Sequence, residues 1–138
     1  MNSRADENAI KGIFDRYATI VNAGDFDGWL SLWADHGVQL PDGAPARVGK
    51  EQIREAMRPV FDGMDLDVTI HGVQDLQVWG DRAVTRSTWS LAMTPKGGGE
   101  TISAMSDAKA LTVFERQSDG TWRIVFDCFN SNVPSAEG

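Results

Sequence analysis

The spacing of the apolar residues changes at about Asp65, and this change constrains the fold more than any other feature of the chain. Before that point apolar residues recur every three or four positions, which is typical of helices. After it come β-branched and aromatic runs divided by the turn signals GD, PKGGG and SDG. Helices followed by strands predict an α+β domain, a cone-like barrel in which three N-terminal helices pack on one strongly curved, mostly antiparallel sheet.

Three helices are expected in the first half of the chain. The first ends at the NAGD sequence of residues 22–25, because Gly24 suits a helix C-terminus and Asp25 can cap a second, short helix. The third begins at Lys50, and Pro59 predicts a kink or an early end. The apolar stripe of the first helix consists of Ile10, Ile13, Phe14, Tyr17, Ile20 and Val21.

The strands are expected to enclose a ligand pocket. A strongly curved sheet that closes over a long helix leaves a cone lined by alternate strand residues and the helix stripe. We expect a single domain over residues 1–138, with residues 133–138 as a loose tail. After a short strand through Val38, the strands are expected at residues 69–73, 76–79, 83–94, 101–116 and 122–132.

The composition argues against several kinds of partner. The net charge of −7 makes nucleic acid and anionic membranes poor partners, and no apolar run reaches the roughly 18 residues of a membrane span. The single cysteine, Cys128, and the lack of a secretory leader predict a cytoplasmic protein. The only histidines, His36 and His71, lack ligand spacing, and no GxGxxG fingerprint is present, so neither a metal nor another cofactor is expected.

Three segments carry a resemblance to a known family: RYATIVNAGDFDGWLSLWADHGVQLPDG, GKEQI and the closing DGTWRIV. Together they resemble the nuclear-transport-factor-two-like superfamily, in particular its SnoaL-like and ketosteroid-isomerase-like branch, over nearly the whole chain. This resemblance implies the cone fold. It implies no single chemistry, since relatives include isomerases, cyclases, hydrolases, dehydratases and non-catalytic assembly domains.

The ketosteroid isomerases provide a template for the chemistry, because a first-strand carboxylate moves the proton while a tyrosine and a protonated Asp hold the oxyanion. Tyr17 matches the tyrosine, and the alternative is a core tyrosine with a satisfied hydroxyl. Leu40 stands where the base is needed, and the nearby Asp42 fits a Pro-Asp-Gly turn. The protonated Asp would fall near Ala110. The nearest carboxylate is Asp107, for which a solvent or subunit-interface position is an equal alternative, so Tyr17 and Asp107 are the best catalytic candidates and the familiar steroid isomerisation is not expected.

Strict alternation along the last strand divides its side chains between two faces. Anchoring on the DGTWRI hairpin directs Trp122, Ile124, Phe126, Cys128 and Asn130 toward the cone. Many SnoaL-like relatives carry histidines where this chain has Phe126 and Cys128. No neighbouring His or Lys in the sequence would activate Cys128 as a nucleophile, so Cys128 is interpreted as a small buried thiol. Asn130 either bonds to a ligand carbonyl or ends the strand. The residues directed away from the cone are Arg123, Val125, Asp127 and Phe129.

The sequence predicts a SnoaL-like protein that binds a small hydrophobic molecule, carbonyl-bearing or polycyclic, and it leaves open whether acid–base chemistry of an isomerase, cyclase or hydrolase type follows. The alternative is a non-catalytic module for dimerisation, assembly or ligand binding. A homodimer through the outer sheet face is expected in either case, with Thr85, Ser87, Val125 and Phe129 as candidates for that face. The predicted ligand-binding residues are Tyr17, Trp33, Leu40, Met57, Phe61, Trp89, Phe126, Cys128 and Asn130, with Trp29 and Met93 as further candidates.

Overall fold

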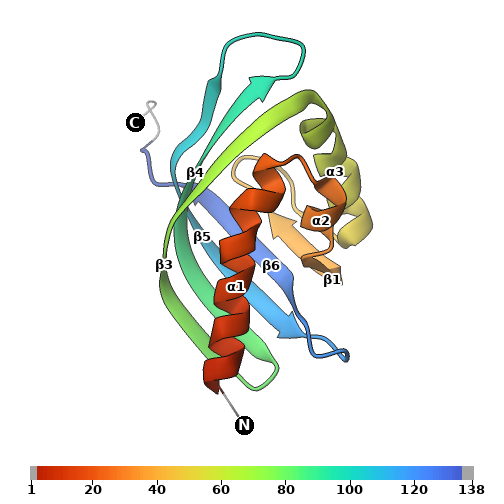
Figure 1. The fold of residues 1–138 in the computed structure, drawn as a ribbon, viewed down its shortest axis with the longest axis vertical. Helices are drawn as coiled ribbons and strands as arrows, with labels where there is room; N and C mark the ends of the chain where they lie inside the picture. Colours follow the sequence, from red (N-terminus) through yellow and green to blue (C-terminus); the bar gives the residue numbers. More distant parts are fainter. Residues whose placement is uncertain (1–2, 135–138) are drawn as a thin grey trace.

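A computed structural model describes residues 3–134 and confirms the α+β architecture, with three helices packed on one face of a curved six-stranded sheet (Figure 1). The strand order is β2-β1-β6-β5-β4-β3; β1 runs parallel to β6 and the other neighbours are antiparallel. Residues 135–138 of the expected loose tail lie outside the described residues. The elements are α1 (Ser3–Asn22), α2 (Phe26–Leu30), β1 (Trp33–Leu40), β2 (Arg47–Val48), α3 (Lys50–Gly63), β3 (Met64–Trp79), β4 (Arg82–Pro95), β5 (Ile102–Arg116) and β6 (Trp122–Ser131).

Helix α1 crosses the concave face of the sheet and is fixed near both ends (Figure 1). Near its start, Asp6 accepts two hydrogen bonds of 2.8 Å from the Arg116 guanidinium, which also lies 4.6 Å above the ring of Trp122. At its end, the Asn22 side chain pairs with both backbone groups of Val68, at 3.1 and 2.7 Å. The helix face that looks into the cone is therefore held in one rotation.

The NAGD turn has the expected structure. Gly24 has a φ of 71°, a conformation that side chains disfavour. The Asp25 carboxylate accepts a hydrogen bond of 2.9 Å from the backbone N–H of Gly28 and so caps α2. This turn sends the chain from α1 directly into the short helix that carries Trp29.

Helix α3 continues beyond Pro59 to Gly63, so the expected early end is wrong. A proline inside a helix removes one backbone hydrogen bond. Burial of Ile53 before it and Phe61 after it, at 0% and 3% exposure, offsets that loss and keeps the helix continuous.

Strand β3 is one strand with two bulges, where the sequence predicted two separate strands. Its pairing with β4 skips His71 and then Gln74. An extra residue bends a strand and increases its twist. The two bulges therefore contribute to the curvature that closes the cone, and the break expected between residues 73 and 76 is absent from the described strand.

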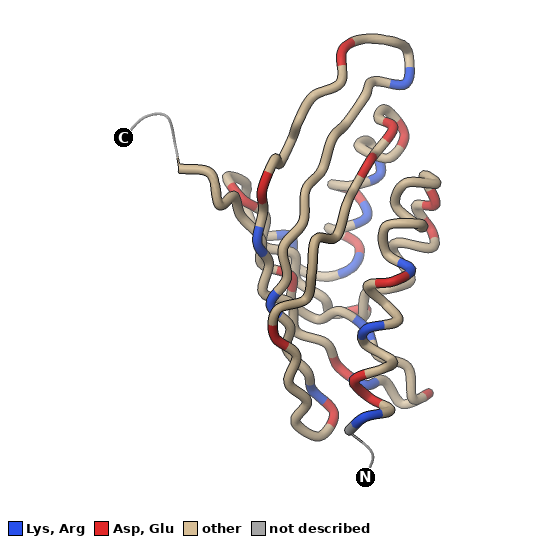
Figure 2. The backbone as a smooth tube through the Cα atoms, turned by 60° about the vertical axis from the view of Figure 1, so that its left-hand side comes forward, with Lys and Arg blue, Asp and Glu red and all other residues tan. Residues whose placement is uncertain are grey.

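The core lies between the helices and the concave face of the sheet. Its centre is an aromatic cluster with ring centroids 5.1 to 6.1 Å apart, formed by Phe26, Trp29, Trp33 and Phe61. Acidic and basic positions are scattered along the helices and strands of the described chain (Figure 2).

Candidate functional site

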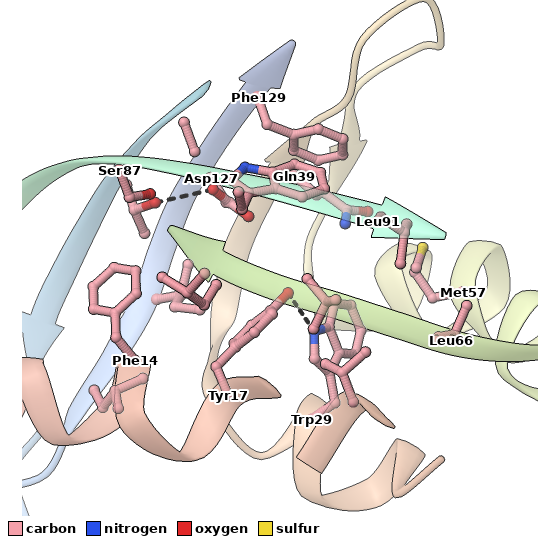
Figure 3. A pocket seen from close by; sticks show the side chains of 18 of the residues that line it. Phe14, Tyr17, Trp29, Gln39, Met57, Leu66, Ser87, Leu91, Asp127 and Phe129 are labelled. Carbon is pink, nitrogen blue, oxygen red and sulfur yellow. Dashed lines mark hydrogen bonds between the residues drawn. The ribbon is translucent and has the colours of Figure 1, made fainter. Parts of the chain in front are cut away.

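A cavity of about 140 Å³, partly open to solvent, lies between α1, α3 and the inner face of the sheet (Figure 3). An engineered cavity of about 150 Å³ holds a benzene molecule, so this space accommodates a ring-sized group. Most of the lining is aliphatic or aromatic. The polar lining residues are Tyr17, Gln39, Ser87, Thr112 and Asp127.

Asp127 is the carboxylate of this cavity. It projects from β6, and its Oδ1 accepts a hydrogen bond of 3.0 Å from the Thr112 hydroxyl of β5. Burial disfavours the charged form and raises the pKa of the Asp127 carboxyl from 3.8 to about 6, while the Thr112 hydrogen bond opposes part of that rise. Such a carboxyl changes its protonation state near neutral pH, as a general acid or base requires.

Tyr17 reaches into the same space from α1, facing the side of the sheet that carries Asp127 (Figure 3). Its hydroxyl oxygen accepts a hydrogen bond of 3.0 Å from the Trp29 indole N–H. Burial first, and then the charge of Asp127, raise the pKa of the Tyr17 phenol, against the effect of the Trp29 bond. The phenol therefore keeps its proton at neutral pH and can donate it in a hydrogen bond to a ligand oxygen.

The facing predicted for β6 is wrong beyond Ile124. Val113 pairs with Phe126 and Phe114 pairs with Ile124, so Val125 is an extra residue in β6. A slip of one residue moves every following side chain to the opposite face.

The consequences of this bulge fall on five predicted positions. Asp127 and Phe129, expected to point away, line the cavity. Phe126 is 42% exposed, and Cys128 is exposed instead of being a buried thiol. Asn130 is exposed as well, and none of these last three lines the cavity.

The structure also corrects the prediction for Leu40. The pairing of β1 with β6 jumps from Trp33 to Val38, and beyond the jump Gln39 lines the cavity at 3% exposure. Leu40 is absent from the lining and pairs with the exposed Cys128. The backbone at position 37 lies so close to Trp33 that it needs glycine, because a Cβ there would lie 2.7 Å from the Trp33 ring.

Three further residues considered from the sequence, Trp33, Asp107 and Asp42, lie outside the cavity lining. Trp33 is a core residue at 1% exposure and is not part of the cavity lining. Asp107 is exposed and accepts a hydrogen bond of 3.3 Å from the Asn132 side chain, away from the cavity. Asp42 lies in a turn, as expected, where it accepts a hydrogen bond of 3.3 Å from the Ser131 backbone.

The sequence assigned four residues to the outer face of the sheet, and these assignments are wrong. Thr85, Ser87 and Val125 are buried, at 1%, 2% and 1% exposure, and Phe129 lines the cavity. Register pairs Leu111 with Cys128 and Val113 with Phe126, which sets these four side chains on the other side of the sheet from Asp127. We call them the outer apolar patch; Leu111 is 53% exposed.

The residues that the structure does gather came mostly from helix spacing. Tyr17, Trp29, Met57 and Phe61 line the cavity together with Trp89 of β4, whereas Met93 does not. Asp127, Gln39, Ser87 and Thr112 were not among the candidates. The one available signal was Asp127 itself, since a lone carboxylate in the apolar run IVFDCF is unusual for a strand.

Among residues 3–134, no three His, Cys, Asp or Glu side chains gather as a metal site would need. None of the helices in that range is both long and apolar enough to cross a membrane.

The helices, the curved sheet and the cavity together form the α+β cone that the sequence motifs predicted. Residues 14–125 match the SnoaL-like domain model, and the chain belongs to that family. A search of curated proteins found no match.

Three solved structures illustrate the similarity. A conserved protein from Planctomyces limnophilus DSM 3776 is 25% identical, with a TM-score of 0.79 over 96% of this chain and 99% of its own. A ketosteroid isomerase-like protein from Erwinia carotovora atroseptica SCRI1043 is 26% identical, with a TM-score of 0.74 over 92% and 96%. A nuclear transport factor 2-like superfamily protein from Salmonella enterica serovar Typhimurium LT2 is 15% identical, with a TM-score of 0.83 over 99% and 98%, and shares the fold.

Proposed function

We propose that the cavity binds a small hydrophobic molecule with a carbonyl group and that Asp127 transfers a proton at the carbon beside that carbonyl. The observation that carries this proposal is the placement of Asp127 in an apolar cavity opposite the Tyr17 hydroxyl. The apolar lining favours a hydrophobic ligand, and the polar groups fix its orientation. Membership of a family with an isomerase-like structural neighbour agrees with proton transfer as the reaction type.

The proposed step uses these two side chains in complementary roles. The Asp127 carboxylate removes a proton from the carbon next to the carbonyl. The C–H electrons form a C=C bond, the π electrons of the carbonyl move to its oxygen, and Tyr17 donates a hydrogen bond to that enolate oxygen. Return of the proton to another carbon gives an isomer, while attack of the enolate on a second carbonyl closes a ring.

Deuterium exchange into 1-indanone tests this proposal without knowledge of the natural substrate. In D2O the protein should accelerate exchange of the protons beside the carbonyl, measured by NMR as a rate proportional to protein concentration. Asp127→Asn should return the rate to that of buffer, and Asp107→Asn, which changes an exposed carboxylate in the same way, should keep the wild-type rate. Binding of 1-indanone without exchange would contradict the proposed proton transfer and favour the alternative of a protein that only binds its ligand.

The outer apolar patch supports a second proposal, a homodimer through the outer sheet face. Leu111 and Phe126, at 53% and 42% exposure, lie on adjacent strands, and apolar side chains grouped in this way are typical of protein contacts. A second copy would cover the patch and the Cys128 thiol. Sedimentation equilibrium should show a dimer, and maleimide should react more slowly with Cys128 as the protein concentration rises; a monomer at high concentration would contradict the proposal.

A further inference from the structure

A row of polar side chains crosses the inner face of the sheet on four neighbouring strands. The backbone register sets Arg47 of β2 opposite Gln39 of β1, Gln39 opposite Asp127 of β6, and Asp127 opposite Thr112 of β5. Two hydrogen bonds lie within the row: Arg47 Nη1 donates to Gln39 Oε1 at 2.8 Å, and Thr112 Oγ1 donates to Asp127 Oδ1 at 3.0 Å. Gln39 and Asp127 are thus neighbours in the lining of one cavity, each fixed from its far side.

The contact with Arg47 determines which end of the Gln39 amide is available to a ligand. A guanidinium has only donors, so the amide oxygen must be the atom that faces it. The amide NH2 group is then directed away from Arg47. Since the Gln39 side chain is 3% exposed and lines the cavity while Arg47 does not, the NH2 group is a hydrogen-bond donor for whatever the cavity holds.

Arg47 is itself held in place by the loop that follows β1. This loop, residues 41–46, returns the chain so that the two-residue strand β2 pairs with β1. Arg47 Nη1 also contacts Met57 Sδ of α3 at 3.4 Å. The loop and α3 therefore fix the guanidinium, and the guanidinium fixes the amide.

We infer that Gln39 is the residue that selects ligands with an acceptor oxygen, and that Arg47 is the positioning residue that keeps its NH2 group turned into the cavity. This inference rests on the proposal that the cavity takes a carbonyl compound. The Gln39 NH2 group, on the sheet beside Asp127, is then a second hydrogen-bond donor in the cavity, in addition to the Tyr17 hydroxyl on the opposite wall. A ligand that has the oxygen gains this hydrogen bond and a ligand that lacks it does not, so the donor favours carbonyl compounds by about the worth of one hydrogen bond.

Binding of 1-indanone and of indane, which lacks the oxygen, tests the role of Gln39. Dissociation constants come from NMR titration, and the ratio of the two constants is the readout. Gln39→Leu should weaken the binding of 1-indanone about fivefold, which corresponds to the loss of one hydrogen bond. The dissociation constant of indane should stay within about twofold of the wild-type value. An unchanged ratio in a folded Gln39→Leu protein would overturn the inference.

Two substitutions of Arg47 test the positioning role without changing the buried amide. Arg47→Met frees the amide to turn its oxygen toward the cavity, so the preference for 1-indanone should fall about threefold. Arg47→Lys should restore the preference, because an ammonium group also has donors only. If Arg47 has only a structural role, both variants will lower stability and neither will change the ratio, which would overturn the inference.

The binding ratio is independent of proton transfer. If Gln39→Leu changes the ratio while wild type exchanges no deuterium, the selection by Gln39 stands and the catalytic role of Asp127 fails. If exchange depends on Asp127 but the ratio does not depend on Gln39, the catalytic role of Asp127 stands and the selection by Gln39 fails.

Discussion

Replacement of Asp127 with asparagine should stabilise the protein at pH 8 and have little effect at pH 4. Asparagine has the shape of the protonated carboxyl group, and its oxygen can still accept the hydrogen bond from Thr112. It removes only the charge that the apolar cavity disfavours. The comparison therefore isolates the cost of keeping an ionised Asp127 in the folded protein.

The expected size follows from the pKa of Asp127, which burial raises from 3.8 to about 6. Because the folded-state pKa is the higher one, the folded protein binds the proton more tightly. The contribution of Asp127 to stability is therefore greatest below pH 3.8 and is lost as the pH rises through 6. The difference of about two pKa units corresponds to about 3 kcal/mol above pH 7, or about 10 °C in melting temperature for a chain of this length.

Urea denaturation of wild type, Asp127→Asn and Asp107→Asn at pH 4, 5, 6, 7 and 8 measures this effect. The stabilisation by Asp127→Asn should grow between pH 4 and pH 7 and then level off. Asp107 is exposed, so its variant should stay close to wild type throughout. A destabilising Asp127→Asn at pH 8, or a difference that is the same at pH 4 and pH 8, would refute the reasoning.

Three further substitutions address other parts of the molecule. Tyr17→Phe should lower the turnover of 1-indanone exchange about 10-fold or more, since the enolate oxygen loses a donor. It should also lower stability by about 1 kcal/mol, because the Trp29 N–H loses its acceptor. Unchanged turnover in the exchange assay would show that Tyr17 does not stabilise the enolate. Gly37→Ala should cost about 1–3 kcal/mol in urea denaturation, because the new Cβ would lie 2.7 Å from the Trp33 ring, and an unchanged midpoint would argue against this contact. Phe126→Glu should convert the proposed dimer into a monomer in sedimentation equilibrium, and a dimer that persists would place the interface elsewhere.

The sequence predicted the helical side of the cavity well. Helix spacing assigned Tyr17 and Phe61 to inward faces, and both line the cavity. An α-helix repeats every 3.6 residues, so a boundary error of one residue leaves the other side chains on nearly the same face. Fixed ends, such as the Asn22 contact with β3, then preserve the rotation of α1.

The strand side could not be predicted in the same way. Side chains alternate every two residues, so one unpaired residue inverts everything after it. The bulge at Val125 moved Asp127 into the cavity and Phe126 out of it. Leu40 was placed by the resemblance to the isomerases, and in the structure its neighbour Gln39 lines the cavity instead. The bulge depends on how β6 pairs with β5, for which the local sequence holds no signal.

The bulge at Val125 therefore brings the carboxylate into the cavity. It places Asp127 on the inner face beside Gln39, where strict alternation would have placed Phe126. In the proposed function, Asp127 on another strand takes the role of the base that position 40 lacks. An ionised group in an apolar cavity lowers stability, and proteins commonly accept such a cost at functional sites.

A crystal structure with 1-indanone would show whether the cavity holds a carbonyl compound in position for proton transfer. The aromatic ring should lie among the apolar lining residues, with the carbonyl oxygen within about 3 Å of a donor from Gln39 or Tyr17 and the adjacent carbon next to the Asp127 carboxylate. A ligand outside the cone, or one whose carbonyl faces solvent while its ring covers Asp127, would contradict the proposal.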